Sequence, residues 1–429
     1  MREALTRAVR FSSSPLPGPA GKALRYTLTH APWTLLASLS AGLSNYIILL
    51  ILSAHYGLAA AGQFRLLLSL ASILSLFCLK ESGKVLLRSL ITGVEGVARA
   101  LLVHRLRWAL AGSAAGLVLA AFLAARGAAR GEDLALPLLA LALLLPAIFP
   151  PDIYAQINQA RRDFRRNAIL SVGKYSALTA AVAVVAAMGM ALPDVLALYV
   201  VALAALQNLF LFLHRGEMEK RPSREVAREA CRESLQLSSS AVLPALAGQA
   251  DKLLISYFLG LEALGLYTIG ISTGRLVLNL VRPNLSIYIP VFVKKPVPDL
   301  YLGLLFLLMT AVGIVCAALA YGYFHLVLGP DYIDAYPYAA VLLVGLGAFA
   351  AGTLAYYSAV YHAETKVAVA VRANLIQAVA IIAYLGGALL WGGEHVLLLF
   401  ALSYPLRELV KLVAIRGLGR GQRLQTAPA

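Results

Sequence analysis

Charged side chains lie inside segments of this sequence that are otherwise apolar. Asp251 and Lys252 are neighbours in the stretch AGQADKLLISYF, and Arg275 and Arg282 follow in the next apolar stretch. Charges are costly inside a lipid bilayer, and those found there usually serve a function. An arginine can grip a phosphate through two hydrogen bonds, whereas a lysine acts as a point charge. This pattern predicts a site inside a membrane that binds an anion.

Arg275 is the deepest of these charges. It lies about eleven residues past the outer end of its apolar segment, which is near the middle of a bilayer. Arg282 is seven residues further along, on nearly the same helix face. It could bind the same anion, or its side chain could extend to the lipid headgroups. The alternative for Arg275 is a structural ion pair with Asp251. Asp251 itself fits a carboxylate that couples transport to an ion, or a partner that locks helices together.

A second group of basic residues is spaced by four. Lys80, Lys84 and Arg88 would form one stripe on a helix, with Glu81 beside Lys80 as a neutralising or coupling partner. The alternative for this stripe is contact with lipid headgroups.

Three further residues complete the candidates for binding a substrate: Asn45, Arg65 and Lys174. Their alternatives are helix packing for Asn45, a place at the membrane interface for Arg65, and contact with headgroups for Lys174. Arg407, Glu408 and Lys411 near the end of the chain are expected to pair within their helix or to reach the headgroups.

The composition predicts an all-α polytopic membrane protein. Hydrophobic residues make up 60% of the 429 positions and charged residues 14%, against about 45–50% and 25% in soluble proteins. The net charge of +16 comes from basic residues that lie mostly between apolar segments, which favours membrane topology over nucleic-acid binding. No metal-ligand spacing, phosphate-binding loop or catalytic motif is visible, so neither a cofactor nor an enzymatic activity is expected.

Apolar runs predict about twelve spanning helices. They lie near 31–54, 64–88, 106–126, 134–157, 168–191, 194–214, 236–258, 264–290, 300–322, 336–361, 367–391 and 395–415. Basic connections alternate with connections that carry almost no basic residue, which places both termini in the cytoplasm. The expected domains are a tail (1–30), a first six-helix bundle (31–214), a cytoplasmic linker with an amphipathic helix capped by Ser223 (215–235), a second six-helix bundle (236–415) and a tail (416–429).

The two bundles are predicted to be a duplication. A shift of 203 positions places Ser53 on Ser256, Gly57 on Gly260, Gly62 on Gly265 and Tyr154 on Tyr357. Two copies in the same orientation predict a parallel repeat around a central cavity, with an axis along the membrane normal and a site between the halves. The second and eighth helices are then equivalent, and their basic residues are expected to converge on one cavity.

Short motifs resemble one transporter family. They are YGLAAAGQF at 56–64, DKLLI at 251–255, LGLY at 264–267, GPDY at 329–332 and HAETK at 362–366. Their order is similar to that in Wzx-type O-antigen and oligosaccharide-lipid flippases of the multidrug/oligosaccharidyl-lipid/polysaccharide exporter superfamily. The resemblance implies two six-helix bundles that move an undecaprenyl-pyrophosphate-linked glycan from the inner to the outer leaflet of a prokaryotic inner (plasma) membrane. Its partners would be that glycan, membrane lipids and the polysaccharide polymerase machinery, and no nucleic acid.

Two other functions compete with the flippase. A multidrug exporter of the same superfamily would need carboxylates for cationic drugs, typically in the first span, where this sequence has none. A membrane-bound polysaccharide polymerase or ligase would need large outer loops, whereas every predicted outer loop is short.

Overall fold

The computed structural model describes residues 19–91, 93–94, 96–127, 134–219, 222–286, 297–361 and 367–426. Within these ranges the chain forms helices and short turns, and no strand. The first half comprises α2 (Pro19–Tyr56), α3 (Leu58–Leu74), α4 (Ser82–Ile91), α5 (Val97–Gly127), α6 (Ala135–Ile148), α7 (Ile153–Ala160), α8 (Phe164–Ala187) and α9 (Leu192–Phe212). The linker carries α10 (Arg215–Glu219) and α11 (Arg224–Ser240). The second half comprises α12 (Val242–Phe258), α13 (Leu261–Ser286), α15 (Asp299–Tyr323), α16 (Tyr336–Val344), α17 (Leu346–Tyr361), α18 (Val367–Trp391) and α19 (Val396–Thr426).

The all-α membrane fold is confirmed. Where the structure describes them, the predicted spans fall on helices, but the number twelve is not confirmed. Among the described residues, nine helices are long and apolar enough to cross a membrane, or ten if α16 and α17, bent by 42°, form one span. Two of the predicted spans are not among them: α12, which has only 17 residues, and α19, which carries three charges in its apolar part. Both helices carry charged residues, Asp251 and Lys252 on α12 and Arg407, Glu408 and Lys411 on α19.

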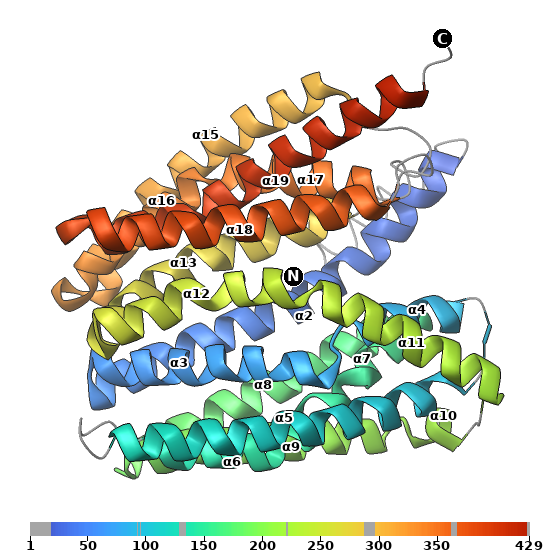
Figure 1. Cartoon of the computed structure of the whole chain (residues 1–429). Coiled ribbons are helices and arrows are strands. Elements are labelled where there is room, and N and C mark those ends of the chain that lie inside the picture. The colour runs from blue at the N-terminus through green and yellow to red at the C-terminus, as the bar shows by residue number, and fades with distance from the viewer. Residues whose placement is uncertain are drawn as a thin grey trace, which may run out of the picture.

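The two halves of the chain form two stacked groups of helices (Figure 1). The group α3 to α9 lies below in this view and the group α13 to α19 above, with α2 and α12 between them. The groups lie close together at the end where α3 and α13 begin. They diverge towards the opposite end, where α4, α10 and the end of α19 lie (Figure 1). A site between the halves is therefore positioned mainly by α2, α3, α12 and α13.

The closest approach of the halves is a crossing of α3 and α13 at two glycines. A Cβ on Gly62 would lie 1.9 Å from the carbonyl oxygen of Leu261, and a Cβ on Gly265 would lie 2.0 Å from that of Leu58. Leu58 and Leu261, like Gly62 and Gly265, are equivalent positions at the offset of 203. The glycine of each half thus packs against the equivalent leucine of the other half, as expected around a two-fold axis. This reciprocity supports the predicted duplication.

The turns that lead into α3 and α13 are also equivalent. Gly57 has φ of +85° and Gly260 has φ of +90°, a region that glycine enters at little steric cost. The backbone therefore reverses at the same point in each copy.

The second predicted span is shorter than expected. It ends in a 3-10 turn at Cys78, after which Leu79 adopts a left-handed conformation with φ of +50° and α4 starts a separate helix. The buried Arg105 of α5 donates to the carbonyl of Cys78 at 3.0 Å and to that of Phe149 at 2.7 Å. Its Nη2 lies 2.8 Å from the Asp152 carboxylate. Arg105 thus replaces the hydrogen bonds that helix continuation would have supplied.

The linker contains the helix α11, which is longer than the one expected. The hydroxyl of Ser223 accepts a hydrogen bond from the backbone N–H of Val226 at 3.3 Å, as an N-cap does. The helix α11 runs on to Ser240, and Ala230 packs in an apolar cluster with residues of α4, α5 and α7. Helices also extend into both predicted tails, α2 from Pro19, a residue favoured in a first turn, and α19 to Thr426.

Hydroxyl groups link the halves towards the end that is predicted to face outside. Tyr332 donates to Ser53 at 3.1 Å, and Thr273 donates to Tyr46 at 3.0 Å. The Tyr46 hydroxyl lies 3.3 Å from that of Tyr323. Tyr323 and Tyr332 therefore join α2 to the second half.

Candidate functional site

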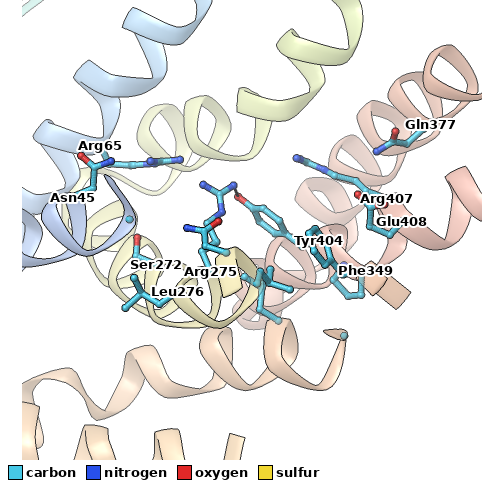
Figure 2. A pocket seen from close by; sticks show the side chains of 16 residues that line it. Asn45, Arg65, Ser272, Arg275, Leu276, Phe349, Gln377, Tyr404, Arg407 and Glu408 are labelled. Carbon is cyan, nitrogen blue, oxygen red and sulfur yellow. Dashed lines mark hydrogen bonds between the residues drawn. The ribbon is translucent and has the colours of Figure 1, made fainter. Parts of the chain in front are cut away.

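A pocket of about 420 Å³ lies between the two halves. Three arginines from three helices line it: Arg65 of α3, Arg275 of α13 and Arg407 of α19. Figure 2 shows their side chains pointing towards one shared space, with Arg65 entering from the first half and Arg407 from the opposite side. The sequence distributes these residues over 342 positions, and the meeting of the halves brings them together.

A buried ion pair supports the pocket from behind. Asp251 and Lys252 are 0% and 1% exposed, and the Lys252 Nζ lies 2.7 Å from the Asp251 Oδ1. The other carboxylate oxygen of Asp251 accepts from the hydroxyls of Tyr267 and Tyr404, both at 3.0 Å. The carboxylate is thereby bonded to groups of α12, α13 and α19. This geometry fits a residue that locks helices together, one of the two alternatives left by the sequence.

Tyr404 connects that ion pair to the pocket. Its hydroxyl donates to Asp251 and accepts from the Arg275 Nη2 at 2.9 Å. The guanidinium carbons of Arg275 and Arg407 each lie 4.9 Å from the centre of its ring, and the Lys252 Nζ lies 5.7 Å from it. Cations at such distances are attracted to an aromatic ring. Arg275 and Asp251 are therefore not directly paired, and Tyr404 lies between them.

Arg65 has no such partner. Its guanidinium makes no hydrogen bond or ion pair with any residue in the described part of the chain, whereas Arg407 donates to the carbonyl of Ala247 at 3.0 Å and lies 3.8 Å from Asp251. The remaining pocket carboxylate, Glu408, is bound by Lys411 at 2.8 Å. The pocket and the residues directly behind it thus contain more basic than acidic side chains. The basic ones are Arg65, Lys252, Arg275, Arg407 and Lys411, and the acidic ones are Asp251 and Glu408. A negatively charged ligand would complete the balance.

The structure brings together only part of the predicted set. Asn45, Arg65 and Arg275 line the pocket, and Lys252 lies behind it. Lys174 is buried elsewhere in the first half, with its Nζ 3.3 Å from the Tyr154 hydroxyl and 4.6 Å from the ring of Tyr175. The side chain of Arg282 lies outside the described residues.

The basic stripe does not reach the pocket. Lys80 is exposed in the turn before α4, so it does not share one helix face with Lys84 and Arg88. Lys84 pairs with Glu81, and Arg88 donates to Glu233 of the linker helix at 2.5 Å. The expected convergence of this stripe with Arg275 is therefore wrong, because the second span stops at Cys78 and α4 packs against α11 instead.

Arg407 and Tyr404 were not among the predicted binding residues. Arg407 was expected to pair within its helix or to reach the headgroups, as Glu408 and Lys411 do pair. The available signal was the spacing of three between Tyr404 and Arg407, which places an aromatic ring and a cation on one helix face.

Comparisons with known proteins agree with this fold. Residues 109–295 match the family model described as polysaccharide biosynthesis protein. No curated protein matches the chain significantly. Among solved structures, an inward-facing multidrug resistance MATE family transporter of the MOP superfamily has a TM-score of 0.63 at 13% identity, over 92% of this chain and 96% of that one.

Two further structures share the architecture. A MOP superfamily transporter from Pyrococcus furiosus has a TM-score of 0.54 at 14% identity, over 94% of this chain and 96% of that one. The MATE transporter VcmN of Vibrio cholerae in its bent form has a TM-score of 0.53 at 12% identity, over 94% and 98%. The chain is thus a multi-pass membrane protein with the fold of MOP-superfamily transporters, and its residues 109–295 match the polysaccharide biosynthesis protein family.

Proposed function

We propose that this protein is a flippase that moves an undecaprenyl-pyrophosphate-linked oligosaccharide from the inner to the outer leaflet, for the synthesis of O-antigen or another surface polysaccharide. One observation carries the proposal: Arg65, Arg275 and Arg407 converge from both halves on one pocket, and Arg65 has no partner among the described residues. Guanidinium groups match the oxygens of a phosphate in geometry and in charge.

The arrangement suggests how the headgroup would be held. Arg65 has all its donors available, and Arg275 uses one Nη2 bond to Tyr404, so both can donate to a pyrophosphate. The polyprenyl chain is apolar and would remain in the lipid. Rocking of the two halves around the bound headgroup would then expose it to either side in turn. The family match over residues 109–295 supports a role in polysaccharide synthesis.

A multidrug exporter remains the second candidate because of the likeness to a multidrug resistance MATE transporter. The charge of the pocket argues against cationic drugs as cargo. Its one lining carboxylate, Glu408, is already bound by Lys411 at 2.8 and 2.9 Å. The Pyrococcus furiosus transporter with this fold is itself described as having a binding pocket of reverse polarity that suggests a different function.

Flipping in reconstituted vesicles tests the proposal. The probe is a fluorescent undecaprenyl-pyrophosphate-linked oligosaccharide, and the variants are Arg65→Ala and Arg275→Ala. Loss of one charge-assisted contact should slow flipping about 10- to 100-fold. Arg228→Ala, which changes an exposed arginine of the linker helix, is the matched control. Unchanged flipping in both pocket variants, or transport of cationic dyes in preference to the glycolipid, would contradict the proposal.

A further inference from the structure

The pocket has a second end, which lies beside Arg407 and opposite Arg65 (Figure 2). It extends from the arginines into the second half, where Phe349 of α17, Gln377 of α18 and Glu408 of α19 line it. Figure 2 shows these three residues on the side of the pocket opposite to Asn45 and Arg65. Both oxygens of Glu408 accept from the Lys411 Nζ, at 2.9 and 2.8 Å, so the two charges cancel. We call the part of the pocket lined by Phe349, Gln377 and Glu408 of this neutral pair the neutral end.

Gln377 lacks a protein partner there. Its amide makes no hydrogen bond to any residue that the structure describes. It lies about 15 Å from one end of α18 and about 21 Å from the other, at the middle depth of a spanning helix. Polar groups at that depth are satisfied within the protein or by what fills a cavity. An amide offers two donors and one acceptor, which suits a ligand rich in hydroxyl groups.

Two other groups make the neutral end suitable for a sugar ring. Phe349 is half-buried against an apolar cluster of the second half and also lines the pocket, so it offers the ring an apolar surface there. The Glu408 carboxylate has about four acceptor sites, of which Lys411 occupies two.

The position of Glu408 is fixed by the backbone opposite. A Cβ on Gly352 of α17 would lie 2.8 Å from the Glu408 carbonyl oxygen and 2.9 Å from its Oε2. The two helices therefore approach so closely that the carboxylate has no room to turn further towards α17.

We propose that the neutral end binds an uncharged sugar ring, namely the sugar joined directly to the pyrophosphate. This inference rests on the proposed function and adds the recognition of the first sugar to it. Hydroxyl groups of the ring would donate to Glu408 and to the carbonyl of Gln377 and accept from the Gln377 amide, while an apolar face of the ring packs on Phe349. Because Glu408 and Lys411 neutralise each other, this pair offers the ring hydrogen-bond acceptors and no net charge.

Binding of two lipid probes to the full-length protein in lipid nanodiscs tests this assignment. One probe is undecaprenyl pyrophosphate alone, and the other carries a single uncharged N-acetylhexosamine. Wild type should bind the sugar-bearing probe more tightly. Gln377→Met removes the amide at similar volume, and we expect its affinity to fall about 3- to 10-fold for the sugar-bearing probe and less than about 2-fold for the bare one.

A second variant and two controls keep the test decisive. Phe349→Leu should show the same selective loss, Arg275→Ala should weaken both probes, and Gln236→Met, on the exposed linker helix, should weaken neither. Equal affinity of wild type for the two probes, or an equal loss for both in Gln377→Met, overturns the sugar site and leaves the arginine site standing. Absence of binding for both probes in wild type overturns the proposed function as well.

Discussion

Replacing Asp251 by asparagine tests whether its carboxylate holds the site together. The substitution keeps an oxygen that can accept from the hydroxyls of Tyr267 and Tyr404, but it removes the negative charge that pairs with Lys252 and Arg407. The side chains of Lys252 and Arg407 remain next to residue 251 in the buried site. We therefore expect Asp251→Asn to destabilise the folded protein through uncompensated positive charge and not through lost hydrogen bonds.

The magnitude follows from two distances. At 2.7 and 3.8 Å, an effective dielectric constant of about 20 gives attractions of about 6 kcal/mol to Lys252 and about 4 kcal/mol to Arg407. The cost of removing the charges from water offsets much of this, and breaking a buried pair on one side costs about 3–5 kcal/mol in practice. An unfolding entropy of about 2 cal/mol/K per residue converts that loss into a fall of about 3–6 °C in Tm for a chain of 429 residues.

Thermal denaturation of the purified protein in detergent measures this effect. Asp194→Asn, the same chemical change at an exposed position of α9, should leave Tm within about 1 °C, as surface substitutions usually do. The double variant Asp251→Asn with Lys252→Met removes both charges of the pair and should recover most of the lost Tm, because a neutral pair leaves less charge uncompensated. A single variant as stable as wild type, or a double variant less stable than the single one, would refute the reasoning.

Three other predictions concern positions outside the charge cluster. Gly265→Ala places a methyl group 2.0 Å from a backbone carbonyl of α3 and should lower yield and Tm, whereas Gly303→Ala, with open space around its Cβ, should change neither. Arg105→Met leaves two backbone carbonyls and one carboxylate without their donor and should lower Tm by several degrees, about 2–5 °C, while the exposed Arg107→Met leaves it unchanged. Burial lowers the pKa of His214, just beyond the end of α9, so the folded state binds its proton less readily than the unfolded state does. Stability should then be full above the ordinary pKa of about 6.5 and should fall at lower pH, a loss that a Tm series from pH 8 to 5 would detect in wild type and find reduced in His214→Gln.

The helices and the duplication were predictable because their signals are local. A run of apolar residues long enough to cross a bilayer must be helical there, since no water is present to satisfy the backbone. The offset of 203 rests on glycines whose positions are fixed by turns and by a close crossing, as Gly57 and Gly62 show. The depth of Arg275 in the membrane was likewise predictable, because it follows from the number of residues between Arg275 and the end of its span.

The rest of the site depends on contacts between helices that are far apart in the sequence. Whether Arg407 reaches its neighbours on α19 or the carbonyl of Ala247 is decided by where α12 lies. The prediction that Lys80, Lys84 and Arg88 share one helix face was wrong for a similar reason. The helix that would have aligned it ends where Arg105, on a different helix, takes up the freed carbonyl groups. Neither event leaves a pattern within the segment concerned.

The crossing of α3 and α13 lies close to one end of each helix, and this has a mechanical consequence. Gly62 is four residues from the start of α3 and twelve from its end, and Gly265 is four from the start of α13 and 21 from its end. At 1.5 Å per residue the short arms are about 6 Å and the long arms about 18 and 32 Å. A tilt of about 10° around this fulcrum would shift the near end by about 1 Å and the far end of α13 by about 5 Å. A tilt around the glycine pair would therefore move the two ends of each helix by unequal distances. A small shift of the helix ends at one surface of the membrane would accompany a large shift at the other.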